Sequence, residues 1–131
     1  MPDENQTATL SARFPQLAGD GAWLKALGTR AASGSFRPGQ TICHEGDSCS
    51  HLALVLSGTA RVYKLAESGR EITLYRIEAG ECCILTASCM LSERVFPANA
   101  VVESDLQAIL VPQSLVSKWI RDFAVWRHFL W

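Results

Sequence analysis

The chain has 131 residues, of which 48% are hydrophobic and 19% are charged, and its 12 Lys and Arg are nearly balanced by 13 Asp and Glu. This length favours a single domain, because a typical domain holds about 100–200 residues. The composition excludes a disordered tail and a collagen-like chain. The net charge of −1 argues against non-specific binding to nucleic acid or to an anionic membrane.

Neither a targeting signal nor a membrane span is evident in the sequence. The chain begins MPDENQ, which is polar and acidic, whereas a secretory signal is first basic and then apolar. No apolar run approaches the about 18–20 residues that a membrane-spanning helix needs. The five cysteines are an odd number and include no Cys-x-x-Cys pair, which fits a disulfide framework poorly. We therefore expect a cytoplasmic domain with free thiols and no membrane partner.

The first two groups of predicted elements are N-terminal helices and a run of strands. Residues 1–13 are polar and are expected to be flexible, and one or two short helices are predicted between Phe14 and Leu27. After Ala32, short runs rich in Val, Ile, Leu and Tyr are separated by turns every about 8–12 residues. Apolar and polar side chains alternate in residues 60–65 and 71–77, with Gly69 in the turn between them. This pattern predicts a mostly β fold, an antiparallel jelly-roll barrel.

The third group is a single helix at the C-terminus. Residues 114–131 contain no Gly or Pro, and Pro112 and Ser114 stand where a helix would begin. Apolar residues recur at helical spacing, and Trp131 extends the same face. The predicted apolar face comprises Leu115, Trp119, Ile120, Phe123, Trp126 and Leu130.

Four short motifs, in a fixed order, resemble the cyclic-nucleotide-binding fold. Residues 37–48 (RPGQTICHEGDS) are similar to its Pro-Gly turn and entry strand, and residues 54–63 (LVLSGTARVY) to its strand pair around a glycine. Residues 68–74 (SGREITL) are similar to its hairpin, and residues 79–81 (AGE) to the entry of its phosphate-binding cassette. The resemblance extends over residues 14–131. It implies a jelly-roll, or double-stranded β-helix, barrel with flanking helices.

Within that superfamily the chain is most similar to the sensor half of a Crp/Fnr-type transcription regulator. The resemblance implies a homodimer formed through the start of a dimerisation helix, residues 114–131, and an effector that controls DNA binding. DNA would be bound only through a helix-turn-helix domain, which is absent from this sequence. We therefore expect residues 14–131 to be the sensor domain of a longer regulator; the alternative is a stand-alone sensor module.

The sequence departs from the family pattern where the phosphate would bind. The resemblance implies a Glu on the ribose hydroxyl and an Arg on the phosphate. Gly80 and Glu81 are present, but Pro97 occupies the arginine position, and Arg94 is the nearby substitute. A lost charged hydrogen bond costs about 1.5–3 kcal/mol, so we expect an effector other than cAMP. The alternative is a signalling module that binds a cyclic nucleotide (cAMP or cGMP) and whose phosphate-binding cassette departs from the family pattern.

Three cysteines occupy the cassette, in residues 82–90 (CCILTASCM). A thiol at a helix N-terminus has a lowered pKa, so these cysteines could sense redox change, thiol-reactive species or a metal. The alternative is that they are packed as small apolar residues. The candidate pocket comprises Gly80, Glu81, Cys82, Cys83, Thr86, Ser88, Cys89, Arg94, Pro97, Ala98 and Asn99.

Metal and enzyme interpretations rest on the same cysteines and on two histidines. A thiolate-bound metal would use Cys82, Cys83 and Cys89, and haem would use His44, His51, Cys43 or Cys82. The turn at residues 44–48 could bring Cys43, Cys49 and His51 together, although their spacing matches no zinc or iron–sulfur pattern. A cysteine enzyme is disfavoured, because no Cys–His pair follows from the spacing and the fold is a binding fold.

Overall fold

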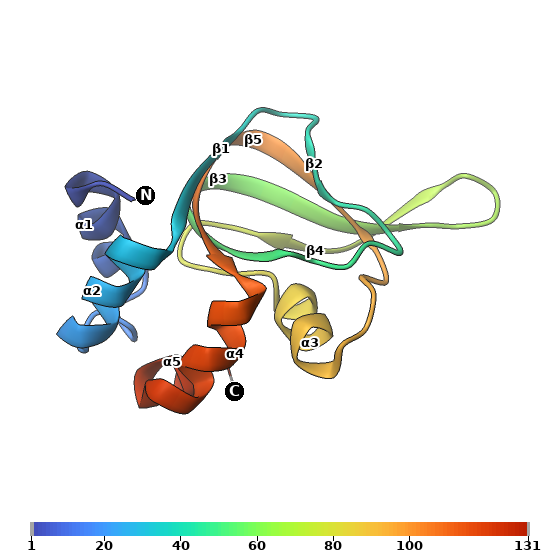
Figure 1. Cartoon of the computed structure of the whole chain (residues 1–131). Helices are drawn as coiled ribbons and strands as arrows, with labels where there is room; N and C mark the ends of the chain where they lie inside the picture. Colours follow the sequence, from blue (N-terminus) through green and yellow to red (C-terminus); the bar gives the residue numbers. More distant parts are fainter. Residues whose placement is uncertain (1, 131) are drawn as a thin grey trace.

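The computed structural model describes residues 2–130, which form five helices and five strands (Figure 1). The helices are α1 (Glu4–Arg13), α2 (Gly21–Arg30), α3 (Ile84–Ser92), α4 (Gln113–Asp122) and α5 (Ala124–Leu130). The strands are β1 (Ala32–Phe36), β2 (Thr41–Cys43), β3 (His51–Leu65), β4 (Glu71–Ile77) and β5 (Asn99–Pro112). None of these helices has the length and hydropathy of a membrane span.

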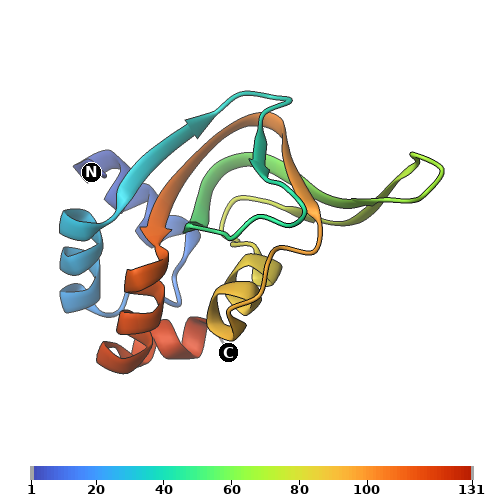
Figure 2. The same cartoon turned by 45° about the vertical axis from the view of Figure 1, so that its right-hand side comes forward.

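The strands form one antiparallel sheet in the order β1-β5-β3-β4, with β2 also paired to β5. Strands β3 and β5 run antiparallel over most of their length, and their register shifts between Val55 and Ala60. Gly58 lies within this irregular stretch at φ +89°, and a Cβ there would collide with the carbonyl oxygen of Asp105. Bulges of this kind bend and twist a sheet. The sheet accordingly curls into the predicted jelly roll, and its inner face is covered by α3 (Figures 1 and 2).

Within the segment of residues 1–13 that was expected to be flexible, Glu4–Arg13 form helix α1. Asp3 caps α1 by accepting a hydrogen bond from the Gln6 backbone, and the Gln6 side chain accepts one from the Asp3 backbone. This reciprocal capping box satisfies two backbone donors at the start of the helix. Leu10 is fully buried, and α1 contacts β3. The cap and the buried leucine together explain why this polar segment is helical.

The C-terminal segment forms two helices rather than the single helix predicted for residues 114–131. Phe123 adopts an extended conformation (φ −131°, ψ 114°) between α4 and α5, so α5 turns away from the axis of α4 (Figure 2). The indole N–H of Trp126 donates to the carbonyl oxygen of Val116 at 3.1 Å, which ties α5 back onto α4. The turn lets the aromatic residues of α5 be buried within the chain. Trp131 lies outside the described residues.

Six aromatic residues from the N-terminal segment and helices α2, α4 and α5 form an aromatic cluster: Phe14, Trp23, Trp119, Phe123, Trp126 and Phe129. Trp23 stacks on Trp126 with ring centroids 5.6 Å apart, and Trp119 meets Trp126 edge to face at 5.7 Å. Leu115, Trp119 and Trp126 are buried within the chain, whereas Ile120, Phe123 and Leu130 are partly buried. The apolar face of residues 114–131, which was expected to form the dimer interface, is therefore largely buried within the domain itself.

Candidate functional site

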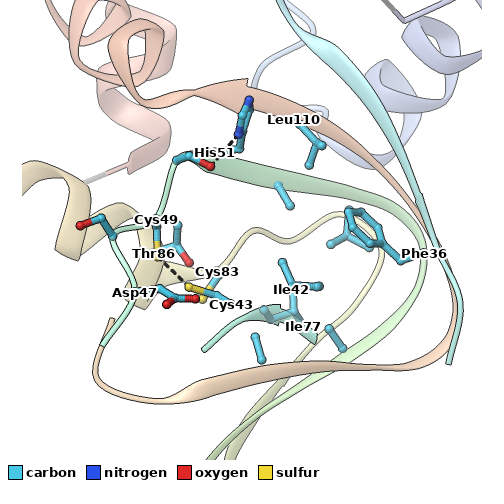
Figure 3. A pocket seen from close by; sticks show the side chains of 16 residues that line it. Phe36, Ile42, Cys43, Asp47, Cys49, His51, Ile77, Cys83, Thr86 and Leu110 are labelled. Atoms are coloured by element: carbon cyan, nitrogen blue, oxygen red, sulfur yellow. Dashed lines mark hydrogen bonds between the residues drawn. The ribbon is translucent and has the colours of Figure 1, made fainter. Parts of the chain in front are cut away.

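A cavity of about 280 Å³ lies between the curled sheet and α3 (Figure 3). One end is apolar and is lined by Phe36 of β1, Ile42 of β2, Ile77 of β4 and Leu110 of β5. The other end carries the sulfur or oxygen atoms of Cys43, Asp47, Cys49, Cys83 and Thr86, and the imidazole of His51 also lines the cavity. The volume is at the small end of the range for ligand pockets, about 300–1,000 Å³.

Two cysteines from either side of one turn meet at the polar end. Cys43 ends β2 and Cys49 precedes β3, and their sulfur atoms are 3.0 Å apart with both thiols free. The intervening turn is closed by the Asp47 carboxylate, which accepts a hydrogen bond from the His44 backbone at 3.0 Å. Gly46 supplies the positive φ of +90° that the turn requires. The local turn therefore fixes the position of this pair, which we call the dithiol pair.

Helix α3 begins at the cavity, with Cys83 at its N-cap. The hydroxyl of Tyr75 lies 3.2 Å from the sulfur of Cys83 and accepts a hydrogen bond from the Leu85 backbone at 3.4 Å. Burial, followed by the hydrogen bond to Cys83, raises the pKa of Tyr75 above its ordinary value. The Tyr75 hydroxyl therefore accepts from a backbone N–H at the start of α3 that would otherwise be free to bind an anionic ligand.

Four of the thiols have a raised pKa, whereas the sequence predicted a lowered pKa for the cassette cysteines. Burial raises the pKa of Cys82 to about 12, and the neighbouring Cys83 and Glu81 add to the effect. Burial likewise raises the pKa of Cys43, Cys49 and Cys89. The largest cause for each of these thiols is desolvation, which disfavours the charged thiolate. These four thiols are therefore protonated at neutral pH.

Of the predicted pocket residues, the structure brings only Cys83 and Thr86 to the cavity. Gly80 and Glu81 belong to a turn beside β3, where the Gly80 N–H donates to Val55 and the Glu81 carboxylate accepts from the Glu78 backbone at 2.7 Å. Cys82 forms an isolated β-bridge with Leu54. The predicted ribose-binding carboxylate thus caps its own turn.

The remaining candidates lie on α3 or after it. Ser88 and Arg94 are exposed, and the buried Cys89 thiol donates to the carbonyl oxygen of Val95 at 3.5 Å. Pro97 is partly buried and Ala98 is fully buried, whereas the side-chain oxygen of Asn99 accepts from the Glu45 backbone at 3.0 Å. None of these six residues lines the cavity, because α3 and the chain after it place them on other faces.

The cavity residues that the predicted pocket omitted come from all five strands and the turn before β3. The sequence did indicate that this turn could gather Cys43, Cys49 and His51, and all three line the cavity. His51 is hydrogen-bonded to the hydroxyl of the adjacent Ser50 at 3.0 Å. Phe36, Ile42 and Leu110 gave no local signal, because their approach depends on the pairing of distant strands.

The resemblance implies an Arg on the phosphate of a cyclic nucleotide, and the lining of this cavity differs from that pattern. Within residues 2–130, no Lys or Arg lines the cavity, and its only lining carboxylate is Asp47. A phosphate placed there would lie in a largely apolar space without a countercharge, which carries a large desolvation penalty. The position of the expected arginine, Pro97, is outside the cavity altogether.

The metal interpretations receive no geometric support either. In the described part of the chain, no three His, Cys, Asp or Glu side chains are grouped so that they could hold a metal ion. Cys82, Cys83 and Cys89 have separate surroundings, namely Leu54, Tyr75 and Val95. His44, a haem candidate, is exposed and pairs with Asp47 at 3.5 Å.

Comparison with known proteins identifies the family. The family model for the cyclic nucleotide-binding domain matches residues 34–122, and the chain belongs to this family. A protein described as a Crp/Fnr-family transcriptional regulator, from Eubacterium rectale, is 28% identical, with a TM-score of 0.76 over 90% of this chain and 55% of its own.

Two protein kinase A regulatory proteins share the fold. The regulatory domain from Toxoplasma gondii with cAMP is 19% identical, with a TM-score of 0.80 over 95% of this chain and 48% of its own. The regulatory subunit of a cAMP-independent protein kinase A from Trypanosoma brucei is 17% identical, with a TM-score of 0.72 over 95% of this chain and 49% of its own. That structure is a triple mutant bound to cAMP, and one of its substitutions introduces an arginine.

The chain spans about half the length of these three proteins. No protein with a curated description matches it significantly.

Proposed function

We propose that this domain is the effector-sensing part of a dimeric Crp/Fnr-type transcription regulator, and that its effector is not a cyclic nucleotide. The observation that carries the proposal is the lining of the cavity. Among the described residues it combines apolar, thiol and hydroxyl side chains with Asp47 and His51, and it includes no Lys or Arg. A small uncharged or thiol-reactive molecule suits such a site, because it needs no countercharge. DNA would be bound by a helix-turn-helix domain outside this chain.

Helix α3 is placed to transmit the state of the cavity. Cys83 and Thr86 reach the cavity from its first turn, and α3 also contacts α4. An effector that moved α3 would therefore change the packing of the C-terminal helices, which lead toward the rest of a longer regulator. Coupling of this kind requires two sites and an element with two positions, a role that α3 would fill.

Two comparisons support this proposal over the cyclic-nucleotide alternative. The 28% identical relative is described as a transcriptional regulator. The Trypanosoma brucei relative, described as cAMP-independent, shows that this fold also serves proteins without a cAMP response. The mutant of that relative, which gains an arginine, is the form bound to cAMP, in line with a requirement for positive charge.

Calorimetric titration of the 131-residue chain with cAMP and cGMP tests the proposal. We expect no saturable binding below about 1 mM of either nucleotide, which corresponds to less than about 4 kcal/mol of binding free energy. Micromolar cAMP binding that is lost in Arg94→Ala, but kept in the matched surface variant Lys118→Ala, would instead support the cyclic-nucleotide module.

A further inference from the structure

We propose that Cys43 and Cys49 are a redox-active dithiol, a modification site that a small uncharged peroxide converts into an intramolecular disulfide. The inference rests on the proposed function and names the chemistry of its signal. It differs from the cassette cysteines that the sequence indicated, since Cys43 belongs to β2 and Cys49 to the turn before β3.

The geometry places the two sulfur atoms within about 1 Å of bonding. They are 3.0 Å apart, compared with about 2.05 Å in a disulfide. The turn between them, residues 44–48, is exposed, so it can take up a movement of this size without repacking the core. Both sulfurs also line the cavity, where a small molecule can reach them (Figure 3). No other pair of cysteines in the described residues has a sulfur–sulfur contact of this kind.

The surroundings indicate which sulfur reacts first. Burial raises the pKa of both thiols, but hydrogen bonds from Cys43 and Thr86 favour the thiolate of Cys49. Asp47 and Cys83 face both sulfurs, and Cys89 also faces Cys49, each with an effect that disfavours ionisation. His51 is the remaining titratable group of the cavity. Cys49 is therefore the attacking sulfur, and Cys43 is the resolving one.

The reaction balances with one peroxide. The Cys49 thiolate attacks one oxygen of hydrogen peroxide, the O–O bond breaks, and Cys49 becomes a sulfenic acid while hydroxide leaves. Cys43 then loses its proton and attacks the sulfenic sulfur, so that the S–S bond forms and a second hydroxide leaves. Two thiols and one hydrogen peroxide give one disulfide and two waters, with two electrons passing from sulfur to oxygen.

Formation of the disulfide would affect the position of α3 through two contacts. Oxidation bonds the Cys49 sulfur to Cys43 and so changes its contact with Thr86, a residue of the first half of α3 whose hydrogen bond favours the Cys49 thiolate. The turn itself is bonded to the chain after α3, since the Gly46 N–H donates to the carbonyl oxygen of Phe96 and the Phe96 N–H donates to Asp47, both at 2.8 Å. A change in this turn therefore acts on both ends of the α3 segment.

Peptide mapping after peroxide treatment tests the inference. Reduced protein is treated with hydrogen peroxide, blocked with an alkylating reagent and digested. We expect a Cys43–Cys49 cross-linked peptide, a mass loss of about 2 Da, and a fall in free thiols from five to three. Oxidised glutathione should react far more slowly, because its size and charge do not suit the small apolar cavity. The absence of the cross-link, or a disulfide mapped to Cys82, Cys83 or Cys89, would overturn the inference.

Cysteine variants and the pH dependence of the oxidation rate test the assignment of the two sulfurs. Cys43→Ser and Cys49→Ser should each abolish the cross-link, whereas the matched variant Cys82→Ser should keep it. Since the wild-type map needs no variant, a variant that fails to fold leaves the test intact. The oxidation rate should rise about tenfold per pH unit from pH 7 and continue to rise beyond pH 9. A rate that levels off below pH 8 would contradict the role given to Cys49.

This outcome and that of the nucleotide titration are independent. A mapped Cys43–Cys49 disulfide together with micromolar cAMP binding would remove the proposed function and leave the dithiol. No disulfide and no nucleotide binding would remove the dithiol and leave the proposed function.

Discussion

The aromatic cluster and the cavity are both buried, but they are packed in different ways. In the aromatic cluster, rings from three helices and the N-terminal segment meet at centroid distances of 5.6–6.3 Å, and Trp126 makes a buried hydrogen bond to Val116. Between α3 and the sheet, by contrast, about 280 Å³ stays unfilled and two thiols face each other without a bond. Interiors are normally filled to the density of organic crystals, so such a void is an exception.

This contrast separates what stabilises the domain from what allows it to respond. Dense aromatic packing holds α2, α4 and α5 together, so those helices are expected to move as one unit. The turn at residues 44–48 and the start of α3 surround the void, and regions with few packed contacts are where proteins open or shift at low free energy. The comparison can be tested by substitutions that should behave differently in the two regions.

The largest expected effect is that of Trp126→Ala in the aromatic cluster. Trp126 is fully buried and contacts the rings of Trp23, Trp119 and Phe129. Its loss should lower the free energy of unfolding by about 3–5 kcal/mol, measured by urea denaturation, because truncation leaves a large cavity. Trp126→Phe, the matched control, keeps a ring but loses the hydrogen bond to Val116 and should lower it by much less. A loss below about 1 kcal/mol for Trp126→Ala would show that the cluster is loosely packed.

A pair of identical substitutions should have unequal effects at two equally buried alanines. Ala60 and Ala108 are both fully buried, but only Ala60 lines the cavity. Ala108→Leu should lower the free energy of unfolding by about 1–3 kcal/mol, because added methylene groups overpack a filled core. Ala60→Leu should have an effect near zero, since its side chain can extend into the void. Equal losses in thermal or urea unfolding would mean that the cavity is not available to be filled.

The sequence predicted the sheet and its turns better than it predicted the cavity. The turns around Gly46 and Gly69 and the bulge at Gly58 depend on local backbone requirements, so their glycines are visible in the sequence, and all three have positive φ. The capping box of Asp3 and Gln6 was also present, but the polar composition of residues 1–13 favoured the flexible interpretation. The burial of Leu10 stabilises the helix even though the composition of the segment is polar.

The break at Phe123 and the lining of the cavity could not be predicted in this way. No Gly or Pro marks the break, which exists because turning α5 brings Trp126 onto Trp23, about a hundred residues earlier in the chain. Likewise, Phe36 approaches the cavity only because it is paired with Leu106 of β5. Both are consequences of tertiary contacts between segments that are distant in sequence. Local periodicity carries no information about them.

The smallest expected destabilisation is that of Tyr75→Phe at the cavity end of α3, which should be weaker than that of Trp126→Ala or Ala108→Leu. The substitution keeps the ring and removes the hydroxyl that contacts the Cys83 thiol and the Leu85 backbone. It should lower the free energy of unfolding at pH 7 by about 0.5–1.5 kcal/mol, the usual net value of a hydrogen bond. Trp126→Phe serves as a control, because it also removes one donor but lies in the aromatic cluster.

The difference between wild type and Tyr75→Phe should also depend on pH. Because burial raises the pKa of Tyr75 in the folded state, the unfolded chain ionises first as the pH rises through about 10. The folded state then binds more protons than the unfolded one, so the wild type loses stability above that pH while Tyr75→Phe does not lose this contribution. The advantage of the wild type should therefore shrink between pH 9 and about pH 11. An advantage that stays constant over that range would mean that the Tyr75 hydroxyl is open to solvent and that α3 starts away from the cavity.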